Sequence, residues 1–225
     1  MSVLILSCGR TGTNMTLELL MASEDLTVRQ REERSLFHNP RVVEDDYLEK
    51  TDTVYIPNLN SIKEVMDLNP DLKIVWTVRD FRDVTMSKIY RGRAGGDGQG
   101  VADDATPEGC IADLKWMYTC GNHIAEHYLD RIFVVKMEDT IQSPDRQARD
   151  LCEKLGIKYN ENMQHFHERT RLETKKSRYK NKIDKSQIAL WENMDTVYDG
   201  YFKDYDFGDA MLFADELNFL FGYES

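Results

Sequence analysis

Short apolar runs alternate along the chain with segments in which apolar residues recur at helical spacing. Three runs are continuous and apolar, as in buried strands: 3–6, 72–78 and 132–136. Two weaker runs, 26–31 and 53–56, are also predicted as strands. Helical spacing occupies 14–21, 58–69, 81–90, 111–128 and 146–155. This alternation predicts an α/β fold with three layers, in which helices cover both faces of a mostly parallel sheet of about four or five strands.

The chain shows no internal repeat and no clear domain boundary. We expect one domain over residues 1–225. Residues 91–109 contain six glycines together with Asp and Pro, which predicts a flexible loop at that place. The part from about 160 to 225 is expected to be helical and irregular.

Net charge and composition indicate which kinds of partner and which cellular location the sequence favours. The net charge of −11 argues against a nucleic-acid partner, although segment 169–185 carries eight basic and only two acidic residues. No apolar stretch approaches the roughly 20 residues of a membrane span, and no secretory signal is recognisable. The four cysteines lack zinc-site spacing. We therefore expect a cytoplasmic protein without a metal site; the sequence indicates no oligomeric state.

The first predicted strand leads into a small-residue turn and then into a helix, an arrangement that binds anions. Unpaired amides and the helix dipole favour negative charge there, and Arg10 adds a cation. A Walker loop is excluded because no Lys follows Gly12 and Asn14 replaces its Ser or Thr; the three-glycine dinucleotide pattern is also absent. The candidate anion-binding residues are Cys8, Gly9, Arg10, Thr11, Gly12, Thr13 and Asn14.

A second candidate anion site follows the strand at 72–78. Arg79 stands at the end of this strand, where ligands of open α/β sheets bind, and Ser87 follows eight residues later on the next helix. A guanidinium and a hydroxyl can hold a phosphate together. The alternative is that Arg79 pairs with Asp83 and that Ser87 is an ordinary helix residue.

Together these segments resemble the sulfotransferases that use 3′-phosphoadenosine 5′-phosphosulfate (PAPS). The family's loop, [KR]-[ST]-G-T-[TS], is similar to residues 10–14, with Asn14 as the one departure, and its Arg and Ser eight apart match Arg79 and Ser87. Residues 134–144 and 151–156 are similar to a third family segment. The resemblance implies a fold like that of P-loop NTPases, PAPS as donor, 3′-phosphoadenosine 5′-phosphate (PAP) as product, and no metal requirement.

The resemblance also implies roles for individual residues. The loop would bind the 5′-phosphosulfate, with Arg10 stabilising the transferring group, and Arg79 and Ser87 would hold the 3′-phosphate. A general base after the second strand would take the acceptor's proton. The candidates for this base are Glu33, Glu32 and His38, although the run around them also fits a solvated set of paired charges. The basic segment would reach back to the 3′-phosphate through Arg178 and Tyr179.

Sulfuryl transfer to a hydroxyl or amine of a small-molecule, carbohydrate or peptide acceptor is thus the function that the sequence favours. The family implies the activity but not the acceptor. Two alternatives stay open at this point: a nucleotide or small-molecule kinase with a P-loop-like turn, and a nucleotide-binding module without catalysis.

Overall fold

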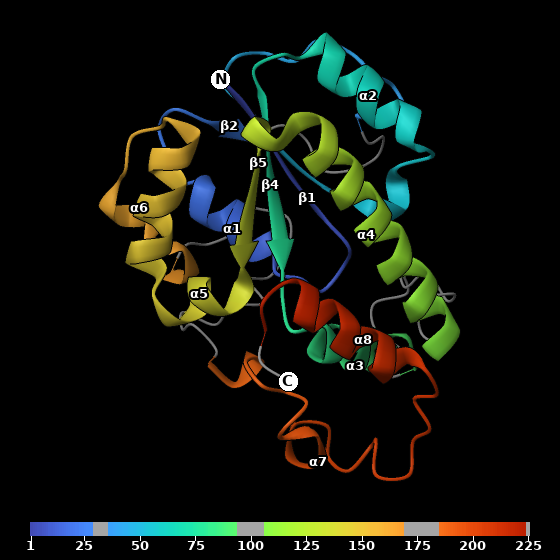
Figure 1. Ribbon diagram of the computed structural model, residues 1–225. Helices are drawn as coiled ribbons and strands as arrows, with labels where there is room; N and C mark the ends of the chain where they lie inside the picture. Colours follow the sequence, from blue (N-terminus) through green and yellow to red (C-terminus); the bar gives the residue numbers. More distant parts are fainter. Residues whose placement is uncertain (29–35, 94–105, 169–184, 224–225) are drawn as a thin grey trace.

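The computed structural model describes residues 1–28, 36–93, 106–168 and 185–223. Five parallel strands form one sheet in the order β2-β3-β1-β4-β5, which confirms the predicted parallel α/β architecture (Figure 1). The strands are β1 (Ser2–Ser7), β2 (Thr27–Val28), β3 (Tyr47–Asp52), β4 (Leu72–Val78) and β5 (Ile132–Lys136). The predicted strands at 3–6, 72–78 and 132–136 are thus β1, β4 and β5.

Helices cover both faces of the sheet. Helices α1, α5 and α6 lie on one side and α2 and α4 on the other, while α3 and α8 lie beyond the carboxyl ends of the strands (Figure 1). The helices are α1 (Thr13–Leu20), α2 (Leu59–Leu68), α3 (Phe81–Arg93), α4 (Pro107–Tyr128), α5 (Met137–Gln142), α6 (Pro144–Leu155), α7 (Met194–Val197) and α8 (Ala210–Leu220). Short 3₁₀ helices are η1 (Thr53–Tyr55), η3 (Leu129–Arg131), η4 (Glu161–Met163), η5 (Phe166–Glu168) and η6 (Lys185–Gln187).

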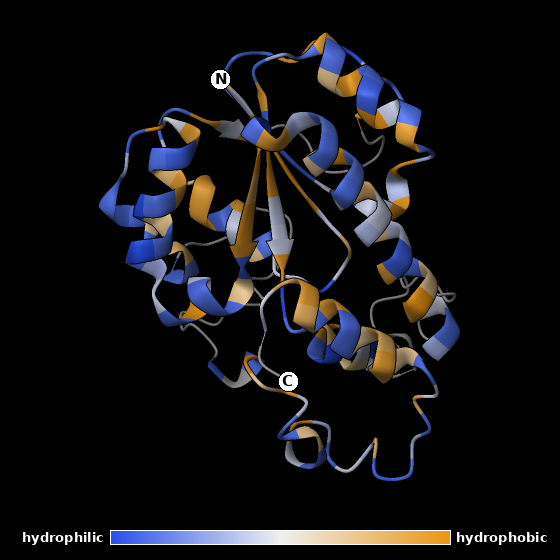
Figure 2. Ribbon diagram, viewed as in Figure 1, coloured by the Kyte–Doolittle hydropathy of each residue, from blue (hydrophilic) through white to orange (hydrophobic). Residues whose placement is uncertain are grey.

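The central strand β1 supplies both halves of the core because successive side chains point to opposite faces. Val3 and Ile5 pack with α1 and α6, whereas Leu4 and Leu6 pack with α2 and α4. Hydrophobic residues accordingly gather along the strands and the inward helix faces (Figure 2). Buried on both faces, β1 holds the loop that follows it in a fixed place.

Two predicted boundaries are wrong. Segment 53–56, expected as a strand, contains the 3₁₀ helix η1, and the strand lies directly before it as β3. The pattern hides β3 because its inward positions include polar residues: Glu49 is buried and accepts a hydrogen bond from the Tyr47 hydroxyl. Residues 91–93 and 107–109, expected in a flexible loop, belong instead to α3, which continues to Arg93, and to α4, which begins at Pro107. Residues 94–105 of the expected loop lie outside the described residues.

Helix α8 fixes the start of α3, and with it the residues that follow β4. The buried Asn218 side chain accepts a hydrogen bond from the Phe81 amide (2.7 Å) and donates one to Asp80 (2.9 Å). Capping of this kind satisfies an amide that a helix N-terminus would otherwise leave unpaired. Among the described helices, none is both long and apolar enough to span a membrane.

Candidate functional site

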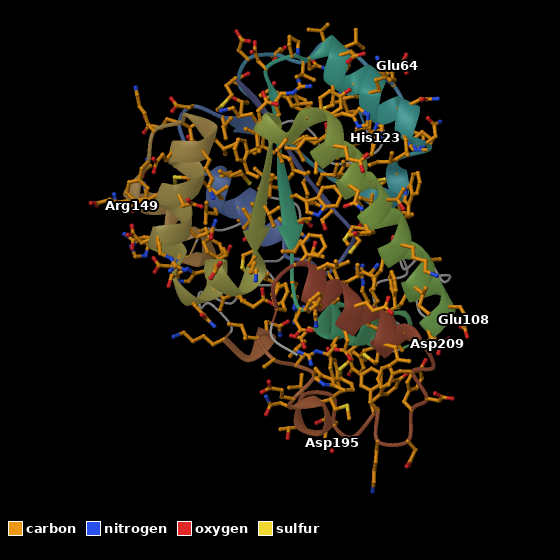
Figure 3. All side chains as sticks on the ribbon, in the orientation of Figure 1. Glu64, Glu108, His123, Arg149, Asp195 and Asp209 are labelled. Atoms are coloured by element: carbon orange, nitrogen blue, oxygen red, sulfur yellow. The ribbon has the colours of Figure 1, made fainter. Side chains whose placement is uncertain are left out.

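Charged side chains in this protein fall into two groups. Most of those in the described parts of the chain lie at the surface, as Glu64 on α2, Arg149 on α6 and Asp195 on α7 do (Figure 3). A smaller group is buried or half-buried around the loop between β1 and α1. Burying charge is costly unless it is paired or used, so this second group marks the candidate site.

The loop itself has an unusual backbone. Gly12, the N-cap of α1, has φ 91°, and Arg10 has φ 77°, a value that non-glycine residues rarely adopt. A Cβ at Gly12 would lie 2.9 Å from Met137 Cγ, so only glycine fits there. The Thr11 hydroxyl bonds the Cys8 carbonyl (2.8 Å) and the Thr77 hydroxyl (2.9 Å), which ties the loop to β4.

The N-terminus of α1 directly follows the loop. No side chain caps this helix, and the Gly12 carbonyl accepts from the amides of Met15 and Thr16. The partial positive charge of the helix N-terminus therefore adds to that of Arg10, as the sequence predicted.

Arg79 lies on one side of the loop and is 2 % exposed. Its Nη2 donates to the Gln187 carbonyl (2.6 Å) and lies 3.4 Å from Asp83 Oδ2, and its Nη1 lies 3.5 Å from the Arg10 carbonyl. Burial raises the pKa of Asp83, while the Arg79 charge acts to lower it. The Nε of Arg79 is buried and has no hydrogen-bond partner.

Ser87 contacts the loop arginine. The Nε of Arg10 donates to Ser87 Oγ (2.8 Å), and the hydroxyl of the buried Tyr198 is also hydrogen-bonded with Ser87. Burial raises the pKa of Tyr198, so the phenol is neutral. Arg79 thus pairs with Asp83, as the alternative interpretation expected, and Ser87 is bonded to the loop cation; a joint phosphate site of Arg79 and Ser87 stays a prediction.

The opposite side of the loop carries a carboxylate. Asp52 is the last residue of β3 and pairs in register with Ser7 of β1. A Cβ at Gly9 would lie 3.1 Å from Asp52 Oδ2 and 3.7 Å from Lys88 Nζ. Burial raises the pKa of Asp52 to about 6, and Lys88 partly offsets this effect. The residue is half-buried, and its Oδ1 accepts a hydrogen bond from the Val54 amide (3.4 Å) at the start of η1.

These residues fit a nucleotide with two anionic groups. The orphaned Nε of the buried Arg79 is a donor without an acceptor, and such groups are rare in native proteins. Gly12, with its positive φ, lets the loop turn into α1 beside Met137. No cluster of three metal-ligating side chains occurs in the part of the chain that the structure describes.

Other candidates from the sequence take different places. Glu32, Glu33, Arg178 and Tyr179 lie outside the described residues. His38 is exposed in the turn at 36–39. The half-buried Asn14 and the buried Thr13 begin α1, and burial raises the pKa of Cys8, which keeps this loop thiol protonated.

Sequence reasoning missed Asp52, Lys88 and Tyr198. Asp52 carries a usable signal, because it is a polar residue at the carboxyl end of a strand, like Arg79. The apolar pattern does not reveal β3, however, so it does not mark Asp52 as the end of a strand. Lys88 and Tyr198 have no signal in their spacing and become visible only through the contacts of α3.

Comparisons with known proteins bear on the family and the fold. The family model described as "Sulfotransferase domain" matches residues 1–207. No curated protein sequence matches the chain significantly.

Solved structures share the fold. The sulfotransferase domain from the curacin biosynthetic pathway is 12 % identical with a TM-score of 0.69, covering 99 % of this chain and 98 % of that one. The sulfotransferase domain of the Synechococcus PCC 7002 olefin synthase is 14 % identical (TM-score 0.67; 100 % and 95 % covered). Mouse sulfotransferase SULT7A1, solved with PAP, is 12 % identical (TM-score 0.55; 95 % and 88 % covered).

Proposed function

Because this chain belongs to the sulfotransferase family and is a PAPS-dependent sulfotransferase, we propose how its residues divide the reaction. The side of the loop that faces β4 holds the 3′-phosphate, the loop holds the 5′-phosphosulfate, and the side that faces β3 receives the acceptor. The single observation that carries this proposal is the position of the loop between Arg79 and Asp52.

The 3′-phosphate is assigned to Arg79 and Ser87, as expected from the sequence, with Arg10 and Tyr198 beside them. The support is the Arg10–Ser87 hydrogen bond of 2.8 Å and the unpaired Nε of Arg79. A guanidinium can offer two parallel donors to a phosphate, and the hydroxyls add further ones. Arg178 and Tyr179 stay proposed as further contacts on the basic segment.

The 5′-phosphosulfate is assigned to the loop from Cys8 to Asn14. Its amides and the N-terminus of α1 favour an anion, and Arg10 supplies charge where the leaving phosphate becomes more negative. Gly12 lets the backbone turn without a clash with Met137. The chemistry that PAPS supplies is an activated sulfuryl group.

Asp52 is our proposed general base, in preference to Glu33, Glu32 and His38. It lies beside Gly9, and its pKa of about 6 leaves it ionised at neutral pH and more basic than an ordinary aspartate. As an acceptor oxygen forms its bond to sulfur, the bond from sulfur to the phosphate oxygen breaks, and the acceptor's proton passes to Asp52. PAP then leaves with the electrons of the broken bond.

The finer features of substrate and location belong to the same proposal. A hydroxyl or amine on a small molecule, a carbohydrate or a peptide is the proposed acceptor class, since such a group has a proton that Asp52 can take. A cytoplasmic location is supported by four cysteines that are all free thiols.

Removing the Ser87 hydroxyl should weaken the 3′-phosphate contact alone. For Ser87→Ala we expect the affinity for PAP to fall about tenfold, while that for adenosine 5′-phosphate, which lacks the 3′-phosphate, changes less than about twofold. Tryptophan fluorescence titration measures both. Thr119→Ala is the matched control, because this exposed hydroxyl on α4 donates to the Lys115 carbonyl of its own helix. An equal loss for both nucleotides in Ser87→Ala would contradict the assignment.

A further inference from the structure

A buried ion pair lies beside Asp52, and the assignments above give it no role. Lys88 follows Ser87 on α3, and Asp113 lies on α4. Lys88 Nζ is 2.5 Å from Asp113 Oδ2, and the two side chains are 3 % and 12 % exposed. Taking two charges out of water costs free energy that the pair recovers only in good geometry. Because this cost is not obviously repaid by stability, we looked to the function of the site for a role of the Lys88–Asp113 pair.

The pair approaches Asp52 from two different helices. Lys88 Nζ and Asp52 Oδ2 both lie close to Gly9, 3.7 Å and 3.1 Å from the position of its Cβ. The other titratable groups that act on Asp52 or share its surroundings are Lys50 on β3 and the protonated Cys8 in the loop. Lys88 and Asp113 are thus the two charges from neighbouring elements, and their signs are opposite.

We propose that Lys88 and Asp113 are positioning residues whose opposite charges act on the nearby Asp52 carboxylate and so set the pH range in which it accepts the acceptor's proton. The proposal rests on the assignment of Asp52 as the general base. Lys88 favours the ionised carboxylate, whereas Asp113 and burial favour the protonated form. With Lys88 alone, Asp52 would be a weaker base; with Asp113 alone, it would be protonated at neutral pH.

The test measures the titration of Asp52 in the unliganded protein, by ¹³C NMR of the aspartate carboxyl carbons. Lys88→Met removes the favourable charge, so the Asp52 midpoint should rise by about one pH unit or more. Asp113→Asn removes the unfavourable charge, so the midpoint should fall by about one unit. A pair that only supports the fold would give no such opposite shifts.

Three further variants make the result specific. Lys88→Arg keeps the charge and should leave the midpoint near that of the unmodified protein. Lys63→Met and Asp67→Asn are matched controls, because this Lys–Asp pair is exposed on α2; neither should move the Asp52 midpoint. If Lys88→Met does not fold, Asp113→Asn alone still decides.

Shifts in the same direction, or midpoints that do not move, would overturn the proposal. The acidic limb of kcat/KM should follow the NMR midpoints in each variant. If the midpoints move in opposite directions while this limb stays fixed, the premise that Asp52 is the base is overturned, and the charge coupling is not. If the unmodified protein does not bind PAP, that result contradicts the proposed donor site instead.

Discussion

Replacing Asp52 by asparagine is expected to lower turnover by about two to four orders of magnitude, the usual contribution of a general base. Asparagine keeps the shape of the side chain but accepts no proton from the acceptor. Since the 3′-phosphate site lies on the other side of the loop, the affinity for PAP should stay within about twofold of that of the unmodified protein. PAP formed from PAPS, separated by chromatography over a panel of alcohol and amine acceptors, measures the turnover.

The pH dependence gives this prediction a second readout. With a pKa of about 6, Asp52 becomes protonated as the pH falls through that value, so activity should decline below about pH 6. Because the folded state raises this pKa, ionisation of Asp52 destabilises the fold above pH 6. Asp52→Asn should therefore be at least as stable as the unmodified protein at neutral pH. Unchanged turnover in a folded Asp52→Asn variant would contradict the role.

Replacing Arg79 by methionine is expected to lower the affinity for PAP by about two to three orders of magnitude. The guanidinium is 2 % exposed, and removing one member of a buried charged contact typically costs several kcal/mol. Arg79→Lys keeps the charge but lacks the forked set of donors. Its affinity for PAP should lie between that of the unmodified protein and that of Arg79→Met. Calorimetric titration with PAP measures the loss.

A matched variant separates this effect from the general loss of an arginine. Arg149 pairs with Asp145 four residues away, as Arg79 does with Asp83, but it is exposed on α6 (Figure 3). Arg149→Met should leave PAP affinity unchanged. Arg79→Met should still bind adenosine 5′-phosphate, which shows that it is folded. If the affinity of Arg79→Met for PAP is within about twofold of that of the unmodified protein, Arg79 does not hold the 3′-phosphate.

The layers of the fold were predictable because its main strands are apolar and continuous. β1 and β4 are buried in a parallel sheet, and β5, although partly exposed at the sheet edge, has a similar hydrophobic run that stands out against polar flanks. β3 is different: buried Glu49 and Thr51 break its apolar pattern. Glu49 is satisfied by the Tyr47 hydroxyl, a partner that the sequence does not show. Periodicity therefore gave the centre of the sheet but not this neighbour of β1.

Some residues of the candidate site could likewise be predicted from local sequence, and others could not. Arg10, Arg79 and Ser87 were identified from motifs, and the structure brings them together through the hydrogen bond between Arg10 and Ser87. Asp52 was missed because its strand was missed, and Tyr198 because it comes from the C-terminal part, more than a hundred residues from Ser87. Contacts over such separations depend on packing, which no local pattern encodes.

The central claim is that the loop and Arg79 form one site for a nucleotide with a 3′-phosphate and a 5′-anion. Calorimetric titration of the unmodified protein with PAP, adenosine 5′-phosphate and ATP, each with and without Mg²⁺, tests it most directly. We expect PAP to bind far more tightly than adenosine 5′-phosphate, and equally well without Mg²⁺. Tighter binding of Mg²⁺–ATP than of PAP, or equal binding of PAP and adenosine 5′-phosphate, would contradict the claim.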